Sequence, residues 1–363
     1  MKLSIELASK RIGIKQEKLE EWENGESKPT IKQLYNIAKI YQRPFAVFYF
    51  PKPPKHFKPL KDFRKFDLTY ALVEEEEYQL QKEILLFQRK REQALELYEL
   101  LDRDFKEFTL KLKSTDNPSI AAKKICVYLK VNHKDIANTD PGYDALNYWK
   151  KFLQEKGILI FQTSRVPLNI MRGACIADSI LPVIIINSND SQNGRIFTLF
   201  HELTHLALRE DSISNFRYSN KADYDKIEIF CNQVSAEILV PEELLLHNSI
   251  VKQKTSPRWT SVEIKNLSKL FCVSEEVIYR RLLTLKRTTK LDYQKFRDSF
   301  KQRPKKKSTG GDYYRNVIAK NGRHFLELAL QGYYQEKVTA SNLFDYTRVK
   351  LSNLKNLEQT LYA

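Results

Sequence analysis

The 363-residue sequence predicts an α+β protein that is mostly helical and contains a small β-sheet. Apolar residues recur at helical spacing over much of the chain, and two β-branched runs, Gly157–Gln162 and Leu181–Ser188, are bounded by turn residues. Hydrophobic residues make up 42% of the chain, which is enough to fill cores and excludes wholesale disorder. A chain of this length holds two or three domains at roughly 100–200 residues each.

No segment has the pattern of a membrane span or an export signal. Apolar runs such as Leu181–Asn187 are far shorter than the roughly 18 residues that a span needs, and the first residues carry charges every few positions. The cysteines at 126, 175, 231 and 272 form no CxxC pair, so we expect reduced thiols in the core. We therefore expect a cytoplasmic protein with no membrane partner.

Four regions follow one another along the chain. We expect short helices over residues 1–56, a helical connector over 57–140, a mixed α/β core over 141–250 and a basic helical region over 251–363. In the first region, Asn24 and Gly25 end a helix and Thr30 is the N-cap of the next. The connector begins with an amphipathic pattern over Tyr70–Phe108, whose early glutamates, Glu74–Glu77, suit a helix N-terminus.

The core region alternates helical and extended patterns. Helices are expected over Tyr143–Lys156, Ile196–Leu208 and Lys226–Val240, the last of them ended by Pro241. Beyond the core, Val262–Leu285 predicts two helices joined by a turn. The N-cap of the second of these is Ser274, and a basic loop follows over residues 301–312.

The positive charge is concentrated near the C-terminus. The last 113 residues hold 24 basic and 10 acidic side chains, which accounts for +14 of the net charge of +16. This excess favours contact with DNA or with an acidic protein face, and Arg280 and Arg281 are available for phosphates. The alternative is a solvated lysine-rich surface, with the helices around residue 280 acting as a cap on the core.

The most informative motif is HELTH at residues 201–205. His201 and His205 are four residues apart and share one helix face, and Glu202 lies beside that face. This spacing predicts a zinc site in which both imidazoles bind the metal and Glu202 takes a proton from metal-bound water. The alternative reading is a pair of hydrogen-bonded core histidines with a surface glutamate.

A catalytic zinc needs a third protein ligand, and the next helix offers a carboxylate. Glu228 follows His201 by 27 residues in an otherwise apolar run, and Asn232 shares its helix face and could hydrogen-bond a ligand. Competing carboxylates are those of Asp223, Asp225 and Glu237. We favour Glu228 and expect Glu237 to be structural.

Four runs together resemble the ImmA/IrrE family of zinc metallopeptidases: NIMRG at 169–173, PVIIIN at 182–187, GRIFTLFHELTH at 194–205 and EIFCNQVSAEILVP at 228–241. The resemblance implies a zincin-like core of the gluzincin type over residues 141–250. It also implies that zinc binds His201, His205 and Glu228, and that Glu202 is the general base.

The first region resembles an XRE-type helix-turn-helix in the residues WENGE at 22–26, Pro29, Thr30 and QL at 33–34. Such modules usually have a helix ahead of the pair that reads the groove, whereas here Leu3–Ser9 is already the first member of the pair and Lys15–Trp22 the second. Two interpretations stay open: a DNA reader, or a degenerate module that docks another helix-turn-helix protein.

The family resemblance implies an anti-repressor, a peptidase that cleaves or antagonises a helix-turn-helix repressor. One alternative is a non-proteolytic regulator that binds DNA or a repressor and has a structural or sensory metal; another is a toxin–antitoxin component. For a peptidase, Leu181–Ser188 is the expected edge strand for an extended substrate. Candidates for stabilising the oxyanion are Arg172, Tyr218 and Tyr224.

Overall fold

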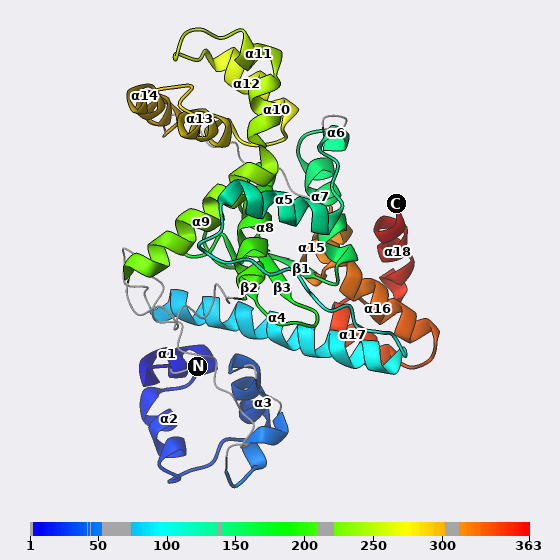
Figure 1. The fold of residues 1–363 in the computed structure, drawn as a ribbon. Coiled ribbons are helices and arrows are strands. Elements are labelled where there is room, and N and C mark those ends of the chain that lie inside the picture. The colour runs from blue at the N-terminus through cyan, green and yellow to red at the C-terminus, as the bar shows by residue number, and fades with distance from the viewer. Residues whose placement is uncertain are drawn as a thin grey trace.

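The computed structural model describes residues 3–41, 43, 45–52, 74–136, 139–209, 221–301 and 312–363. It is mostly helical with a small sheet, as the sequence predicts (Figure 1). The proline-rich stretch from residue 53, with the expected boundary at 56/57, and nearly all of the expected basic loop at 301–312 lie outside the described residues.

The N-terminal module comprises α1 (Ile5–Ile12), α2 (Gln16–Glu23), α3 (Ile31–Ile40) and the 3-10 turn η1 (Phe45–Tyr49). Its own apolar cluster includes Ala8, Leu19 and Ile37. Thr30 is the N-cap of α3 and forms a capping box with Gln33, which confirms the predicted helix start.

The connector helices are α4 (Glu74–Leu100), α5 (Pro118–Leu129), α6 (His133–Ile136) and α7 (Tyr143–Glu155). The long helix α4 runs beneath the sheet in Figure 1, and its first turn lies beside the N-terminal module. Tyr78 of α4 is 1% exposed and belongs to the same apolar cluster as α1 and α3. The module is therefore packed on the start of α4.

The sheet consists of β1 (Leu159–Thr163), β2 (Gly173–Ile176) and β3 (Val183–Asn187) in the order β1-β3-β2. Strands β1 and β3 are parallel, with Leu159 opposite Val183, and β2 is antiparallel to β3, with Gly173 opposite Ile186. The strands β1 and β3 confirm the prediction that the two β-branched runs are strands. The sequence pattern missed β2 because this four-residue strand has only one β-branched residue.

Alternate residues of the strands face two different cores. Ile160 and Ile184 belong to the core beneath α8, whereas Phe161 and Ile185 belong to the core that contains α4. Period-two alternation between two apolar faces is the pattern of a sheet covered by helices on both sides. The strands are accordingly apolar at nearly every position.

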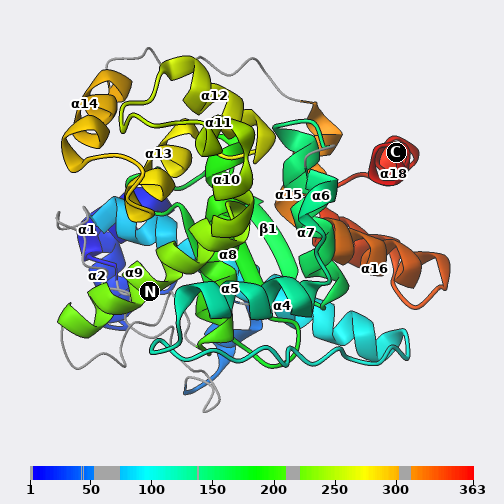
Figure 2. The same cartoon turned by 45° about the horizontal axis from the view of Figure 1, so that its top comes forward.

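The first core is covered by α8 (Gln192–Ala207), α9 (Lys221–Leu239), α10 (Glu242–His247), α11 (Ser249–Lys252), α12 (Ser261–Leu270), α13 (Glu275–Thr284) and α14 (Lys290–Lys301). Ser274 caps α13 through its side chain, as predicted. The helices from α10 to α14 form the yellow and gold part of Figure 2.

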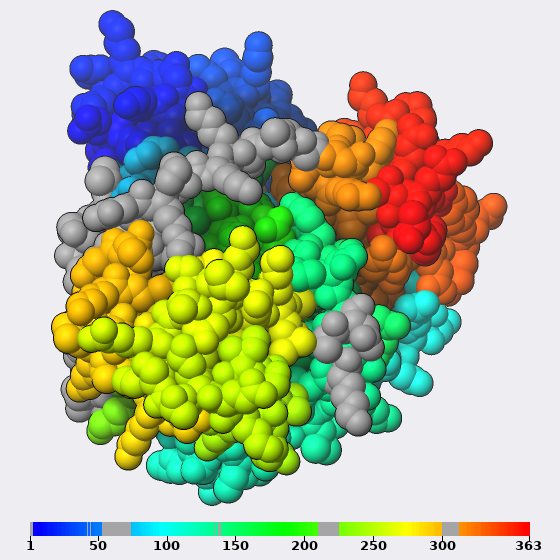
Figure 3. Space-filling view, turned by 90° about the horizontal axis from the view of Figure 1, so that it is seen from above, coloured from blue at the N-terminus to red at the C-terminus, as the bar shows by residue number. Residues whose placement is uncertain are grey.

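The second core is covered by α4 and by α15 (Tyr313–Asn321), α16 (Arg323–Tyr334), α17 (Ala340–Thr347), η4 (Leu351–Asn353) and α18 (Leu354–Tyr362). The residues after 250 are thus divided between opposite faces of the sheet. In Figure 3 the N-terminal module, in blue, and the C-terminal helices, in orange to red, lie at separate corners of the face shown. The division into four regions stays a prediction.

All four cysteines are free, and Cys175, Cys231 and Cys272 are buried while Cys126 is partly buried. Among the described residues, no helix is long and apolar enough to cross a membrane.

Lys90 provides a test of how α4 is joined to the C-terminal helices. Its ammonium donates to Asn321 Oδ1 at 2.6 Å and to the Tyr346 carbonyl at 3.3 Å, and it lies 4.5 Å from the centre of the Phe325 ring. Burial lowers the pKa of Lys90 to about 7. In the unfolded chain the pKa of a lysine is about 10.4, so between about pH 7 and pH 10 the unfolded chain binds more protons at residue 90 than the folded chain does.

The free energy of unfolding should therefore contain a Lys90 contribution that rises from pH 7 towards pH 10 and is flat below pH 7. Urea unfolding at pH 7 and at pH 9.5 measures this contribution. We expect the free energy of unfolding to rise less between the two pH values for Lys90→Met than for the unsubstituted chain. Lys111→Met, at an exposed position, is the control. If the free energy of unfolding rises equally with pH in Lys90→Met and in the control, Lys90 is not a buried titrating group.

Candidate metal centre

Helix α8 carries the HELTH motif into the centre of the molecule. Ser191 caps the helix by accepting a hydrogen bond from the Gly194 amide at 3.1 Å. The helix packs on the sheet, on α7 and on α9, so even its polar residues are enclosed: Glu202 is 4% exposed and His205 is 1% exposed. Polar groups buried this deeply need partners, because an unpaired buried polar group is destabilising.

Helix α9 brings Glu228 to the two imidazoles. Its Oε1 lies 3.1 Å from His205 Nε2 and its Oε2 lies 3.2 Å from His201 Nε2. The two Nε2 atoms are themselves 3.2 Å apart. The sequence-predicted trio is thus brought together, and ligand atoms from the three residues all lie within 4.8 Å of one another.

The donor set fits a zinc ion in both chemistry and spacing. Zinc bonds of about 2.0–2.1 Å at tetrahedral angles put neighbouring ligand atoms about 3.3 Å apart, close to the separations in this cluster. Two histidines and one carboxylate are also a known ligand set of catalytic zinc sites. Among the described residues, this is the one His/Cys/Asp/Glu group with metal-binding spacing.

The electrostatics of the cluster favour an ionised carboxylate. Burial raises the pKa of Glu228, but hydrogen bonds to His201 and His205 outweigh it and hold that pKa well below its usual range. Burial lowers the pKa of His201, but Glu228, Glu202 and a side-chain hydrogen bond with Asn232 outweigh it and raise that pKa. Asn232 therefore supports His201, the role that the helix spacing predicts for it.

Glu202 lies beside the trio at the point where α8 contacts β2. Its Oε2 atom is buried and has no hydrogen-bond partner among the described residues. A Cβ atom on Gly173 of β2 would lie 2.9 Å from Glu202 Oε1 and 2.3 Å from Thr198 Cγ2. Gly173 thus lets the strand approach the glutamate, a role that the sequence analysis missed because a lone glycine carries no such signal.

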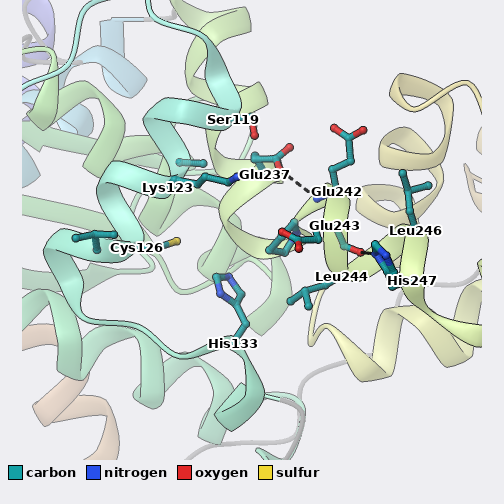
Figure 4. Close-up of a pocket in the computed structure, with 13 residues that line it drawn as sticks. Ser119, Lys123, Cys126, His133, Glu237, Glu242, Glu243, Leu244, Leu246 and His247 are labelled. Atoms are coloured by element: carbon teal, nitrogen blue, oxygen red, sulfur yellow. Dashed lines mark hydrogen bonds between the residues drawn. The ribbon is translucent and has the colours of Figure 1, made fainter.

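Neither Asp225 nor Glu237 joins the cluster. Asp225 is exposed, and the side chain of Asp223 lies outside the described residues. Glu237 forms an ion pair with Arg281 of α13 and accepts a hydrogen bond from the Glu242 amide at 3.1 Å. Its structural role is as expected, and it faces a separate pocket of about 630 Å³ between α5 and α10 (Figure 4).

Arg281 corrects one sequence-based expectation. The residue is 6% exposed, and its guanidinium pairs with Glu237 and donates to the Val240 carbonyl at 3.0 Å. Arg281 is therefore not available to a phosphate, whereas Arg280 on the same helix is exposed. An (i, i+1) pair points in different directions on a helix, which the charge count alone does not reveal.

The expected substrate strand is also corrected. The run Leu181–Ser188 forms β3, which is the central strand with β1 on one side and β2 on the other, so it has no edge for a peptide. The edge strand beside α8 is β2. Of the oxyanion candidates, Arg172 forms an ion pair with Asp190 at 3.0 Å, and the side chains of Tyr218 and Tyr224 lie outside the described residues.

Comparison with protein families finds two matches. Residues 154–283 match the peptidase M78 family, described as an IrrE N-terminal-like domain, and residues 1–48 match a helix-turn-helix family. The first match covers the sheet, both histidines, Glu202 and Glu228, and the second covers α1, α2 and α3. A comparison with curated proteins finds no match.

Gly173→Ala tests the contact between β2 and α8. The added methyl group would crowd Thr198 and Glu202, and overpacking of this kind reduces stability by about 1–3 kcal/mol. Thr198→Ser removes the Cγ2 methyl group, so the double variant should recover part of the loss. Urea unfolding of the full chain measures both effects. A neutral Gly173→Ala, or a double variant as unstable as the single one, would contradict the contact.

Proposed function

We propose that this chain is a zinc-dependent endopeptidase with a zincin-like core, and that it acts as a cytoplasmic anti-repressor by cleaving a helix-turn-helix transcriptional repressor. The observation that carries the proposal is the convergence of His201, His205 and Glu228 beside the buried Glu202. The peptidase family match over the same residues supports it.

In this proposal His201, His205 and Glu228 hold the zinc ion. Zinc held there would lower the pKa of a bound water molecule and would polarise the carbonyl of the scissile peptide bond. Asn232 orients His201 through its side chain. The ionised state of Glu228 suits it to the metal, because a carboxylate must be deprotonated to act as a ligand.

Glu202 is the general base of the proposed reaction. It takes a proton from the attacking water and then delivers it to the nitrogen of the leaving amine. The close approach of the Gly173 backbone limits the space around its side chain. Burial from solvent strengthens its interaction with charge that develops nearby.

The substrate segment is proposed to lie along β2. An extended peptide adds to a sheet edge through main-chain hydrogen bonds, and β2 is the edge strand that contacts α8. Such a site selects a segment that is exposed and locally unfolded. The helix-turn-helix match suggests a DNA- or repressor-related role, and DNA contact through the basic region after residue 250 stays a prediction.

Glu202→Gln tests the proposed chemistry. The full chain is co-expressed with a helix-turn-helix repressor, and the repressor is followed by immunoblot. We expect cleavage by the unsubstituted chain and a loss of roughly 10²–10⁴-fold in Glu202→Gln, since the general base is removed while the ligands stay. Glu242→Gln, the same substitution on exposed helix α10, should cleave normally.

Two results would contradict the proposal. Cleavage that persists in Glu202→Gln would remove the general base from the mechanism. Relief of repression by both the unsubstituted chain and Glu202→Gln, with no cleaved product from either, would favour a regulator that binds the repressor without proteolysis.

A further inference from the structure

The N-terminal module places its helix pair differently from a pair that is free to bind DNA. In helix-turn-helix complexes the first helix crosses the DNA backbone and the second enters the major groove with its N-terminal residues. Backbone phosphates are bound by cationic side chains and by the amides of helix N-termini. In this chain the sequence pattern assigns α1 and α2 as the two helices of the pair, and both lie within the helix-turn-helix match.

The N-terminus of α1 is already bound to a carboxylate. The amide of Ser4 donates to Glu74 Oε1, and the Ser4 hydroxyl donates to Glu74 Oε2 at 2.7 Å. These hydrogen bonds lower the pKa of Glu74. A carboxylate of α4 thus occupies the end of α1 where a phosphate would bind.

One of the two cationic side chains of α1 is bound to the next carboxylate, that of Glu75. Arg11, in the last turn of α1, forms an ion pair with Glu75 and lies 3.8 Å from the centre of the Tyr78 ring. Tyr78 is buried, and its hydroxyl donates to the Ile40 carbonyl at 3.1 Å. Glu74, Glu75 and Tyr78 in the first turns of α4 therefore hold the amide end of α1, its arginine and the end of α3.

The charge of α2 is unsuited to the major groove. Its eight residues include four glutamates and one lysine, and Lys18 is paired with Glu21 at 2.5 Å. Glu17, Glu20 and Glu23 are exposed. Duplex DNA carries one negative charge per about 1.7 Å of its axis, so these carboxylates would be repelled along the whole helix.

We infer that the helix-turn-helix pair of this chain does not read DNA, and that α1 is instead an intramolecular docking surface whose partner is the acidic first turn of α4. Glu74 and Glu75 take the places that phosphates have in a helix-turn-helix complex with DNA. The module is thereby fixed to the helix that underlies the sheet. This inference does not depend on the peptidase activity.

The test compares two pairs of substitutions on α4 in the full chain. Glu74→Gln with Glu75→Gln removes the docking carboxylates. Glu92→Gln with Glu99→Gln makes the same charge change at exposed positions further along the helix. Hydrogen exchange of the α1 amides should be about fivefold faster in the first pair than in the second, as expected for two exposed charged contacts. Equal exchange in the two pairs would show that these carboxylates do not dock the module.

The affinity of the full chain for a 30-base-pair DNA duplex tests whether the module reads DNA. It is measured by fluorescence anisotropy at two salt concentrations. Arg11→Ala with Lys15→Ala should leave the affinity unchanged within twofold, and Glu74→Gln with Glu75→Gln should bind no more tightly than its control pair. A substantial loss of affinity in Arg11→Ala with Lys15→Ala would show that the module binds DNA. If Glu74→Gln with Glu75→Gln binds more tightly than its control pair, and adding Arg11→Ala abolishes this increase, the module is a DNA reader that α4 holds closed.

Discussion

The contact between α8 and α9 is the constraint on which the molecule depends. It brings two imidazoles and two carboxylates together beside an apolar core, and it buries His205 and Glu202, where polar groups are stable only with partners. His201, His205 and Glu228 face one another around a common point. Among the described residues, Glu202 Oε2 and His205 Nδ1 have no hydrogen-bond partner. The same contact that forms the core therefore forms the proposed catalytic site.

The surrounding architecture fixes this contact from several directions. The sheet supports α8 from below, and Gly173 allows β2 to approach it closely. Beyond Glu228, α9 continues to Glu237, whose ion pair with Arg281 joins it to α13. The opposite face of the sheet is covered by α4 and the C-terminal helices, which lie outside the peptidase family match but complete the second core.

Local sequence patterns predicted the three metal-binding candidates and several helix boundaries. The four-residue spacing of His201 and His205 and the place of Glu228 in an otherwise apolar run are properties of single segments. Helix caps such as Thr30 and Ser274 are also local features. The features that were missed depend on contacts between segments. Strand order made β3 central, and the Arg281 ion pair required knowing where α13 packs.

The metal content of the purified full chain tests the central claim most directly. After dialysis against zinc and then against metal-free buffer, elemental analysis should find one zinc ion per chain. Glu228→Gln should retain substantially less, while Asp225→Asn, a change of the same kind at an exposed position of α9, should keep the full amount. Absence of bound zinc in the unsubstituted chain, or equal zinc in both variants, would contradict the account.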